Sequence, residues 1–67
     1  MRDEIGAAAG VVWGVLDRDG ELTLTALKDR AGLSDQMVFL ALGWLAREGK
    51  LTLLREGRAT RVSLIRP

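Results

Sequence analysis

The eleven residues 41–51, with the sequence ALGWLAREGKL, constrain the fold most because they combine the end of a helix with the start of a strand. An apolar stripe at helical spacing runs into this block from residue 35 onwards. Gly49 is suited to end the helix, because glycine readily adopts the left-handed conformation found at many helix ends. The stripe consists of Val38, Ala41, Leu42 and Leu45. The block therefore predicts a helix over about residues 35–48, followed by a strand that begins at Leu51.

A second helix is predicted just before this one, over residues 24–31. Thr23 is suited to cap its start, and Ser34 is suited to cap the start of the next helix, because hydroxyl oxygens accept from free amides of a first turn. Gly32 lies between the two helices as a stop signal. The inward positions of the shorter helix are Leu24, Leu27 and Ala31. Two short helices separated by about three residues around a glycine are typical of a helix-turn-helix.

The remaining segments predict a first helix and a closing hairpin. Residues 3–18 form the helix, residues 21–23 a short extended piece, and residues 51–55 and 60–65 two strands joined by a turn at 56–58. The inward stripe of the first helix is Ile5, Ala9, Val12 and Leu16, flanked by Ala8 and Trp13. The buried faces of the strands carry Leu51 and Leu53 opposite Val62 and Leu64. This order predicts an α+β, mainly α, winged helix-turn-helix in a single domain over residues 1–67.

The block ALGWLAREGKL resembles the hallmark of a small bacterial and archaeal winged helix-turn-helix family of unknown function. The other positions that match the family pattern are Ile5-Gly6, Ala9-Gly10, Val12-Trp13, Gly20-Glu21-Leu22 and Val62-Ser63-Leu64. The resemblance covers nearly the whole chain and implies a stand-alone, dimeric winged helix with no assigned ligand. The chain departs from the family near Val11 and Gly14, where polar residues are usual, and in its hairpin, which is rich in arginine rather than acidic.

Candidate DNA contacts come from the third helix and from the hairpin. In this motif the third helix enters the major groove, where Gln36 is suited to pair with adenine and Arg47 to hold a phosphate or guanine. The hairpin and its base carry the cations Lys50, Arg55, Arg58, Arg61 and Arg66. These cations are interpreted either as phosphate contacts or as charges that protect an exposed strand edge. Phe39, Leu40 and Gly43 offer no hydrogen bonds and favour contact with another protein instead.

The outward side of the first helix carries almost no charge. It consists of Gly6, Ala7, Gly10, Val11, Gly14 and Val15. Interior glycines each cost a helix about 1 kcal/mol relative to alanine, so this face predicts the interface of a homodimer. The alternative is that the C-terminal strand of the same chain covers it. Trp13 and Trp44 flank inward stripes and are interpreted as packing between the first and third helices.

Composition argues against several classes of function. The chain has no Cys and no His, so a disulfide is excluded and a zinc site is not expected. No catalytic constellation is visible, hence no enzyme, cofactor or small-molecule ligand is expected. The acidic start and the short apolar runs predict neither a signal peptide nor a membrane span, and a cytoplasmic location is expected.

Two functions remain open. The first is a homodimeric winged-helix protein that binds double-stranded DNA, such as a small transcriptional regulator. The second is a winged-helix module for association with proteins that does not bind DNA. The net charge of +1, from ten Lys and Arg against nine Asp and Glu, is low for a nucleic-acid binder, so the distribution of charge decides between them.

Overall fold

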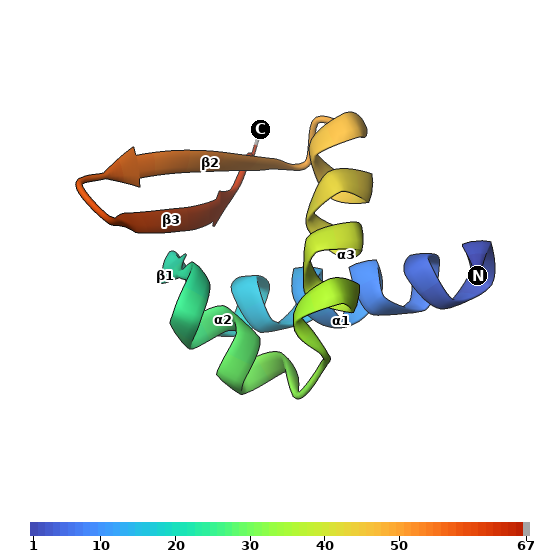
Figure 1. The fold of residues 1–67 in the computed structure, drawn as a ribbon. Coiled ribbons are helices and arrows are strands. Elements are labelled where there is room, and N and C mark those ends of the chain that lie inside the picture. Colours follow the sequence, from blue (N-terminus) through green and yellow to red (C-terminus); the bar gives the residue numbers. More distant parts are fainter. Residues whose placement is uncertain (67) are drawn as a thin grey trace.

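The computed structural model describes residues 1–66, in which three helices and a three-stranded sheet follow one another in the predicted order. The elements are α1 (Arg2–Asp19), β1 (Leu22–Thr23), α2 (Leu24–Ala31), α3 (Asp35–Arg47), β2 (Leu51–Glu56) and β3 (Ala59–Leu64). α1 crosses α3, and the β2–β3 hairpin projects to one side of the helices (Figure 1). This architecture confirms the winged helix-turn-helix, with helix and strand ends within one residue of those predicted.

The side chains predicted as caps hold the starts of α2 and α3. The Thr23 hydroxyl accepts from the Ala26 N–H at 3.2 Å, and the Ser34 hydroxyl accepts from the Met37 N–H at 3.1 Å. Each bond satisfies an amide that has no partner inside its own helix. The turn between the two helices is held on one side by the Ser34 cap and on the other by the Gly32 N–H, which donates to the Lys28 carbonyl at 3.3 Å.

The end of α3 explains why the block at residues 41–51 constrains the fold. Gly49 has a φ of 70°, a left-handed conformation that glycine adopts without a steric penalty. Its N–H donates to the Ala46 carbonyl at 3.0 Å, and the Lys50 N–H donates to the Leu45 carbonyl at 2.9 Å. This pair of bonds is the Schellman motif. It turns the chain sharply, so that β2 begins at Leu51 directly beside α3.

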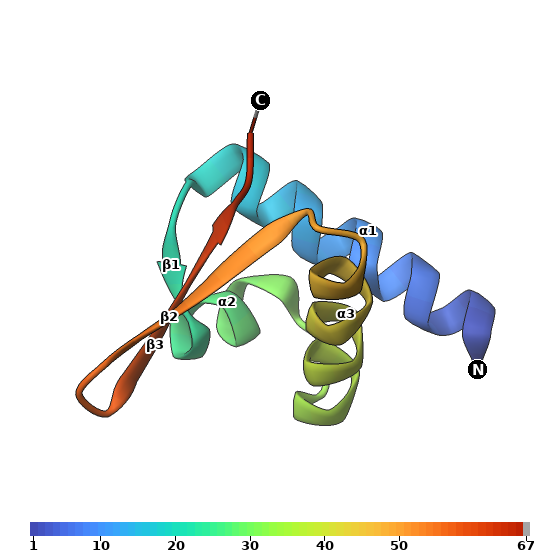
Figure 2. The ribbon, with the colours of Figure 1, turned by 90° about the horizontal axis from the view of Figure 1, so that it is seen from above.

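The sheet is antiparallel, with β3 between β1 and β2. Glu56 pairs with Ala59, which leaves Gly57 and Arg58 as a two-residue turn. Gly57 has a φ of 60° whereas Arg58 does not have a positive φ, as in the type II′ turn that suits twisted hairpins. The hairpin extends well past α2, so the backbone of its tip projects beyond the helices (Figure 2).

The core lies between the three helices and the base of the sheet. Its buried side chains are Ala8, Ala9, Val12, Val15 and Leu16 of α1, Leu27 of α2, Val38, Ala41, Leu42 and Leu45 of α3, Leu51 of β2 and Val62 of β3. The predicted stripe of α3 is therefore confirmed in full. The prediction for Leu53 is wrong: this side chain is 48% exposed although its register partner Val62 is buried, because Val62 lies on the central strand whereas Leu53 lies on the edge strand β2.

The predicted outward side of α1 is wrong at both of its ends. Val15 is buried within the single chain, because α2 and β3 also pack on α1 and widen its buried stripe. Gly6 faces α3, where a Cβ atom would lie 3.8 Å from Cζ2 of Trp44. Trp44 is packed against the core as predicted, but Trp13 is 38% exposed and is not a core residue.

A carboxylate at the end of α1 ties this helix to α2. Asp19 accepts from Arg18 Nε at 3.1 Å and lies 3.1 Å from Arg30 Nη1. These hydrogen bonds, that of Arg18 first, lower the pKa of Asp19 below its ordinary value of 3.8. The carboxylate therefore stabilises the fold above the unfolded-state pKa, and this contribution is lost as the pH falls through the lower folded-state pKa.

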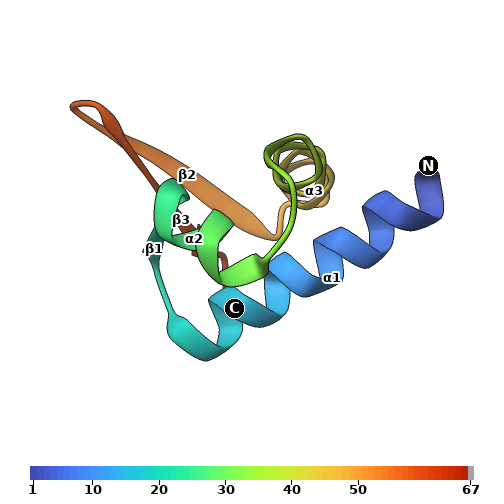
Figure 3. The ribbon, with the colours of Figure 1, turned by 60° about the horizontal axis from the view of Figure 1, so that its bottom comes forward.

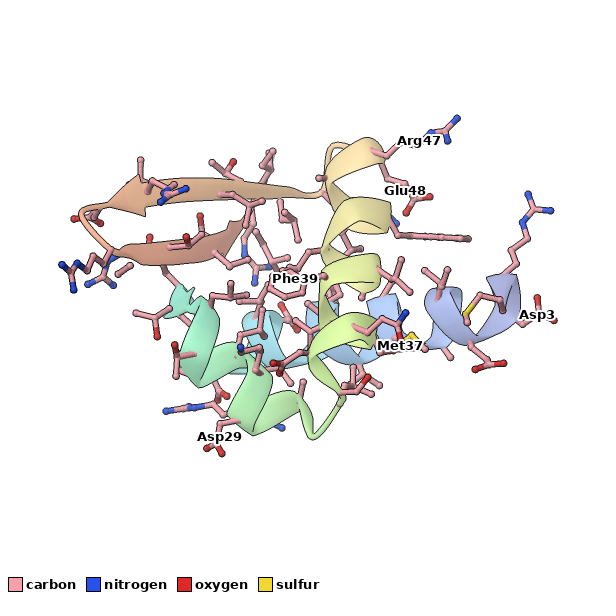
Figure 4. The ribbon with its side chains drawn as sticks, in the orientation of Figure 1. Asp3, Asp29, Met37, Phe39, Arg47 and Glu48 are labelled. Atoms are coloured by element: carbon pink, nitrogen blue, oxygen red, sulfur yellow. The ribbon has the colours of Figure 1, made fainter. Side chains whose placement is uncertain are left out.

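In Asp19→Asn, the melting temperature is accordingly expected to fall less steeply than in the wild type as the pH is lowered into the acid range. Thermal melting of the wild type and the variant between pH 7 and pH 2 measures this effect. Asp29→Asn is the matched control: Asp29 lies on the exposed side of α2 and pairs with no cation within residues 1–66 (Figure 4). Equal acid dependence in the wild type and in Asp19→Asn would show that the carboxylate does not hold the two helices together.

Candidate nucleic-acid interface

α3 is placed as the recognition helix of a helix-turn-helix. Its buried stripe packs on α1 and on the base of the hairpin, and Figure 3 shows it nearly end-on with α1 to one side and the hairpin to another. The remaining surface of the helix is exposed. It carries Gln36, Phe39, Leu40, Gly43 and Arg47. A duplex that touches both α3 and the hairpin has to lie across this surface.

The two polar residues predicted on α3 lie at opposite ends of the helix. Gln36 is exposed in the first turn, and Arg47 is the last residue of the helix, so about 16 Å of helix separates them. Arg47 points away from the hairpin (Figure 4) and lies in a hollow with Arg2, Trp44 and Glu48. The structure therefore does not bring Arg47 together with the predicted contacts on the hairpin.

The predicted hairpin arginines are divided between the two faces of the sheet. Arg55 lies on the same face as Leu53, and Arg61, opposite Leu54 in the register, lies on the other face. Arg61 is also paired: its Nε is 2.9 Å from Glu56 Oε1 and its Nη1 is 3.6 Å from Glu21 Oε1. Its charge is thus largely compensated by the chain itself.

Two further predicted cations are compensated in the same way. Lys50 Nζ lies 3.6 Å from Glu48 Oε1, and Arg66 Nη2 lies 2.7 Å from Asp17 Oδ1. Within the described residues, the structure pairs no carboxylate with three of the predicted cationic contacts. They are Arg47, Arg55 and Arg58. Arg55 and Arg58 share the outer half of the hairpin and form the cationic part of the site.

A groove between α3 and the hairpin is the feature that sequence reasoning missed. It has a volume of about 540 Å³ and is lined almost entirely by apolar atoms. The lining residues are Leu24, Phe39, Leu42, Gly43, Ala46, Leu53, Arg55 and Thr60. The sequence signal was present on α3, where Phe39, Gly43 and Ala46 recur at helical spacing, but the opposite wall depends on where the hairpin lies. We call this feature the α3–hairpin groove.

Residues 1–66 contain no group of three or more acidic side chains placed to hold a metal ion. None of the three helices described is long and apolar enough to cross a bilayer.

Comparison with known proteins agrees with the fold. A family model described as "Winged helix-turn-helix domain (DUF2582)" matches residues 1–64. The chain is also similar to a protein of Methanocaldococcus jannaschii named "Uncharacterized protein MJ1608", with 33% identity over 61 residues. The aligned part covers 87% of this chain and 86% of that protein. The chain therefore belongs to the winged helix-turn-helix family DUF2582.

Proposed function

We propose that this winged helix binds double-stranded DNA through phosphate contacts made by the outer half of its hairpin. The observation that carries the proposal is the position of Arg55 and Arg58. Both are exposed, neither has a carboxylate partner among the described residues, and the hairpin that carries them stands beside the exposed side of a recognition helix. Arginine side chains in such a position are suited to phosphates or to a narrow minor groove.

The same surface supports little reading of base sequence. Gln36 is suited to adenine, but Phe39 and Leu40 beside it offer no hydrogen bonds and are 53% and 36% exposed. Arg47 lies at the far end of the helix and faces away from the hairpin. Binding is therefore expected to be similar for unrelated sequences and in the range of about 10⁻⁴–10⁻⁶ M at physiological salt. Titration of two unrelated labelled duplexes with the protein tests this expectation.

We also propose that the protein acts as a homodimer through the exposed part of α1. This part consists of Ala7, Gly10, Val11 and Gly14. A Cβ atom built at Gly10 or Gly14 meets nothing within 4 Å, so nothing within the chain requires glycine at these positions. A second backbone that approaches closely would explain both glycines, and a two-fold axis satisfies one self-complementary patch.

Val11→Glu is expected to separate the dimer, because Val11 is 44% exposed in the single chain and a buried carboxylate without a partner is costly. The measurement is the molecular mass in solution at a protein concentration of roughly tens of micromolar. This mass should fall from twice the chain mass in the wild type to the chain mass in the variant. Thr25→Glu adds the same charge on exposed α2 and serves as the control, which should stay dimeric. A wild-type protein that is already monomeric under these conditions would refute the dimer.

The α3–hairpin groove favours a second function, association with another protein without DNA. Apart from Arg55, its lining is almost entirely apolar and offers little to a phosphate backbone, and apolar grooves on small proteins commonly mark interaction sites. Under this alternative, duplex binding stays undetectable even at low salt.

A further inference from the structure

The wall of the α3–hairpin groove that α3 provides has an apolar pattern suited to contact with another helix. This wall is formed by Phe39, Leu42, Gly43 and Ala46, which follow the spacing i, i+3, i+4 and i+7. This is the spacing by which helices present one face to one another. The stripe covers about 10 Å of helix, or two turns. Leu53 of β2, which is 48% exposed, forms the facing wall.

The middle of the groove is open down to the backbone of α3. A Cβ atom built at Gly43 meets nothing within 4 Å, and no positive φ requires glycine there. Glycine in a helix interior is unfavourable by itself. Because Gly43 has no side chain and lies between Phe39 and Ala46, another helix can approach the backbone of α3 closely at this position.

The groove has a cation at its edge near the hairpin. Arg55 lines it together with Leu53 and has no carboxylate partner within residues 1–66. At the other end Lys28 Nζ lies 5.9 Å from the centroid of the Phe39 ring, but Asp35 Oδ1, 3.5 Å away, compensates its charge. An occupant with a negative charge near Arg55 would therefore complete both the apolar and the electrostatic match.

We propose that the α3–hairpin groove binds an amphipathic helix of another protein. The helix carries apolar residues at i, i+3 or i+4, and i+7, and an acidic residue that faces Arg55. This mode of recognition lays the apolar face of one helix into a groove. The proposal goes beyond DNA binding and does not depend on it, although a helix bound at Arg55 would compete with a duplex for this side chain.

A second copy of the chain does not fit the groove equally well. A second copy offers two exposed apolar helix faces. That of α3 carries Phe39 and Leu40. However, the one acidic residue of this helix, Asp35, is already paired with Lys28 and is not free to face Arg55. That of α1 carries Ala7, Gly10, Val11 and Gly14. Contact between α1 of one copy and the groove of the next is heterologous, and such contacts tend to build open chains of molecules rather than closed dimers. The groove is therefore assigned to a different protein.

A pair of synthetic peptides tests the proposal. Both are 18 residues long and helical, with leucine at i, i+3, i+4 and i+7; one carries glutamate beside the stripe and the other carries lysine at the same positions. Fluorescence anisotropy of each labelled peptide with the wild-type protein is expected to show about tenfold tighter binding of the glutamate peptide. Arg55→Glu is expected to reverse this preference.

Gly43→Leu blocks the groove and completes the test. The variant is expected to melt no lower than the wild type, since the new side chain enters open space, and to lose at least about tenfold in affinity for the glutamate peptide. Failure of the glutamate peptide to bind, or a peptide preference that Arg55→Glu leaves unchanged, would overturn the proposal. A Gly43→Leu protein that loses its dimer would also overturn it, because the groove would then hold a second copy. Duplex titrations of the same variants report separately on DNA binding.

Discussion

Leu27→Ala is expected to lower the free energy of unfolding by about 2–5 kcal/mol. Leu27 is the residue through which α2 enters the core, and its side chain is 0% exposed. Alanine in its place removes apolar contacts and leaves a cavity between α2 and the other two helices. The whole domain of 67 residues is expected to have a free energy of unfolding of about 3–10 kcal/mol. The substitution therefore removes a large part of the stability, which denaturant unfolding measures directly.

Leu54→Ala is the matched control for this prediction. The same atoms are removed, but Leu54 is 54% exposed on the hairpin, so the free energy of unfolding should change by less than about 0.5 kcal/mol. Equal effects of the two substitutions would mean that α2 does not pack through Leu27, and the helix-turn-helix would have to be placed differently.

Arg55→Ala combined with Arg58→Ala is expected to weaken duplex binding by about tenfold or more. The two side chains are the hairpin cations without a carboxylate partner in the described part of the chain, and each phosphate contact adds about 0.9 to the slope of log K against log salt. The double variant should therefore lose affinity about equally for unrelated sequences. The slope of log K against log salt should become less negative by about 2 for each hairpin that contacts the duplex.

Arg61→Ala combined with Arg66→Ala is the control, since it removes the same formal charge from the same part of the chain. Both arginines are held by carboxylates, Arg61 by Glu56 and Glu21 and Arg66 by Asp17, so the loss of affinity should be smaller. An unchanged affinity of the Arg55/Arg58 variant would remove the hairpin from the DNA interface. A loss confined to one sequence would indicate base reading instead of phosphate contact.

The fold could be predicted from the sequence because its boundaries are set by local chemistry. Thr23 and Ser34 accept hydrogen bonds from amides three residues further on, and Gly49 ends α3 with bonds to residues of the same turn. Such contacts depend on neighbours in the sequence, so the pattern of residue types is sufficient to locate them. The stripe of α3 was predictable for the same reason.

The exposure of individual apolar residues could not be predicted, because it depends on what covers them. Leu51 and Leu53 have the same place in the strand alternation, yet Leu51 is 5% exposed and Leu53 is 48% exposed. Leu51 lies at the start of β2 beside α3, whereas Leu53 lies further along this edge strand, where less of the helices covers it. Trp13 and Trp44 differ similarly, since Trp44 lies over Gly6 of α1 whereas Trp13 remains at the surface.

The candidate site was predicted only in outline for a related reason. The sequence showed the cations of the hairpin but not which of them are paired. Arg61 meets Glu21, and Arg66 meets Asp17, across 40 and 49 positions of the chain. The α3–hairpin groove likewise needs two elements that only the folded chain brings together. Arg55 and Arg58 stand out once these contacts are known.

The affinity of the wild-type protein for a 20-base-pair duplex between 50 and 200 mM salt tests the proposed function most directly. Two phosphate contacts from Arg55 and Arg58 predict a straight line of log K against log salt with a slope of about −2 for one hairpin, and about −4 when both hairpins of a dimer touch the same duplex. Affinity should fall by about tenfold in the first case and about a hundredfold in the second. An affinity that does not change with salt, or no binding at 50 mM, would contradict DNA binding through the hairpin.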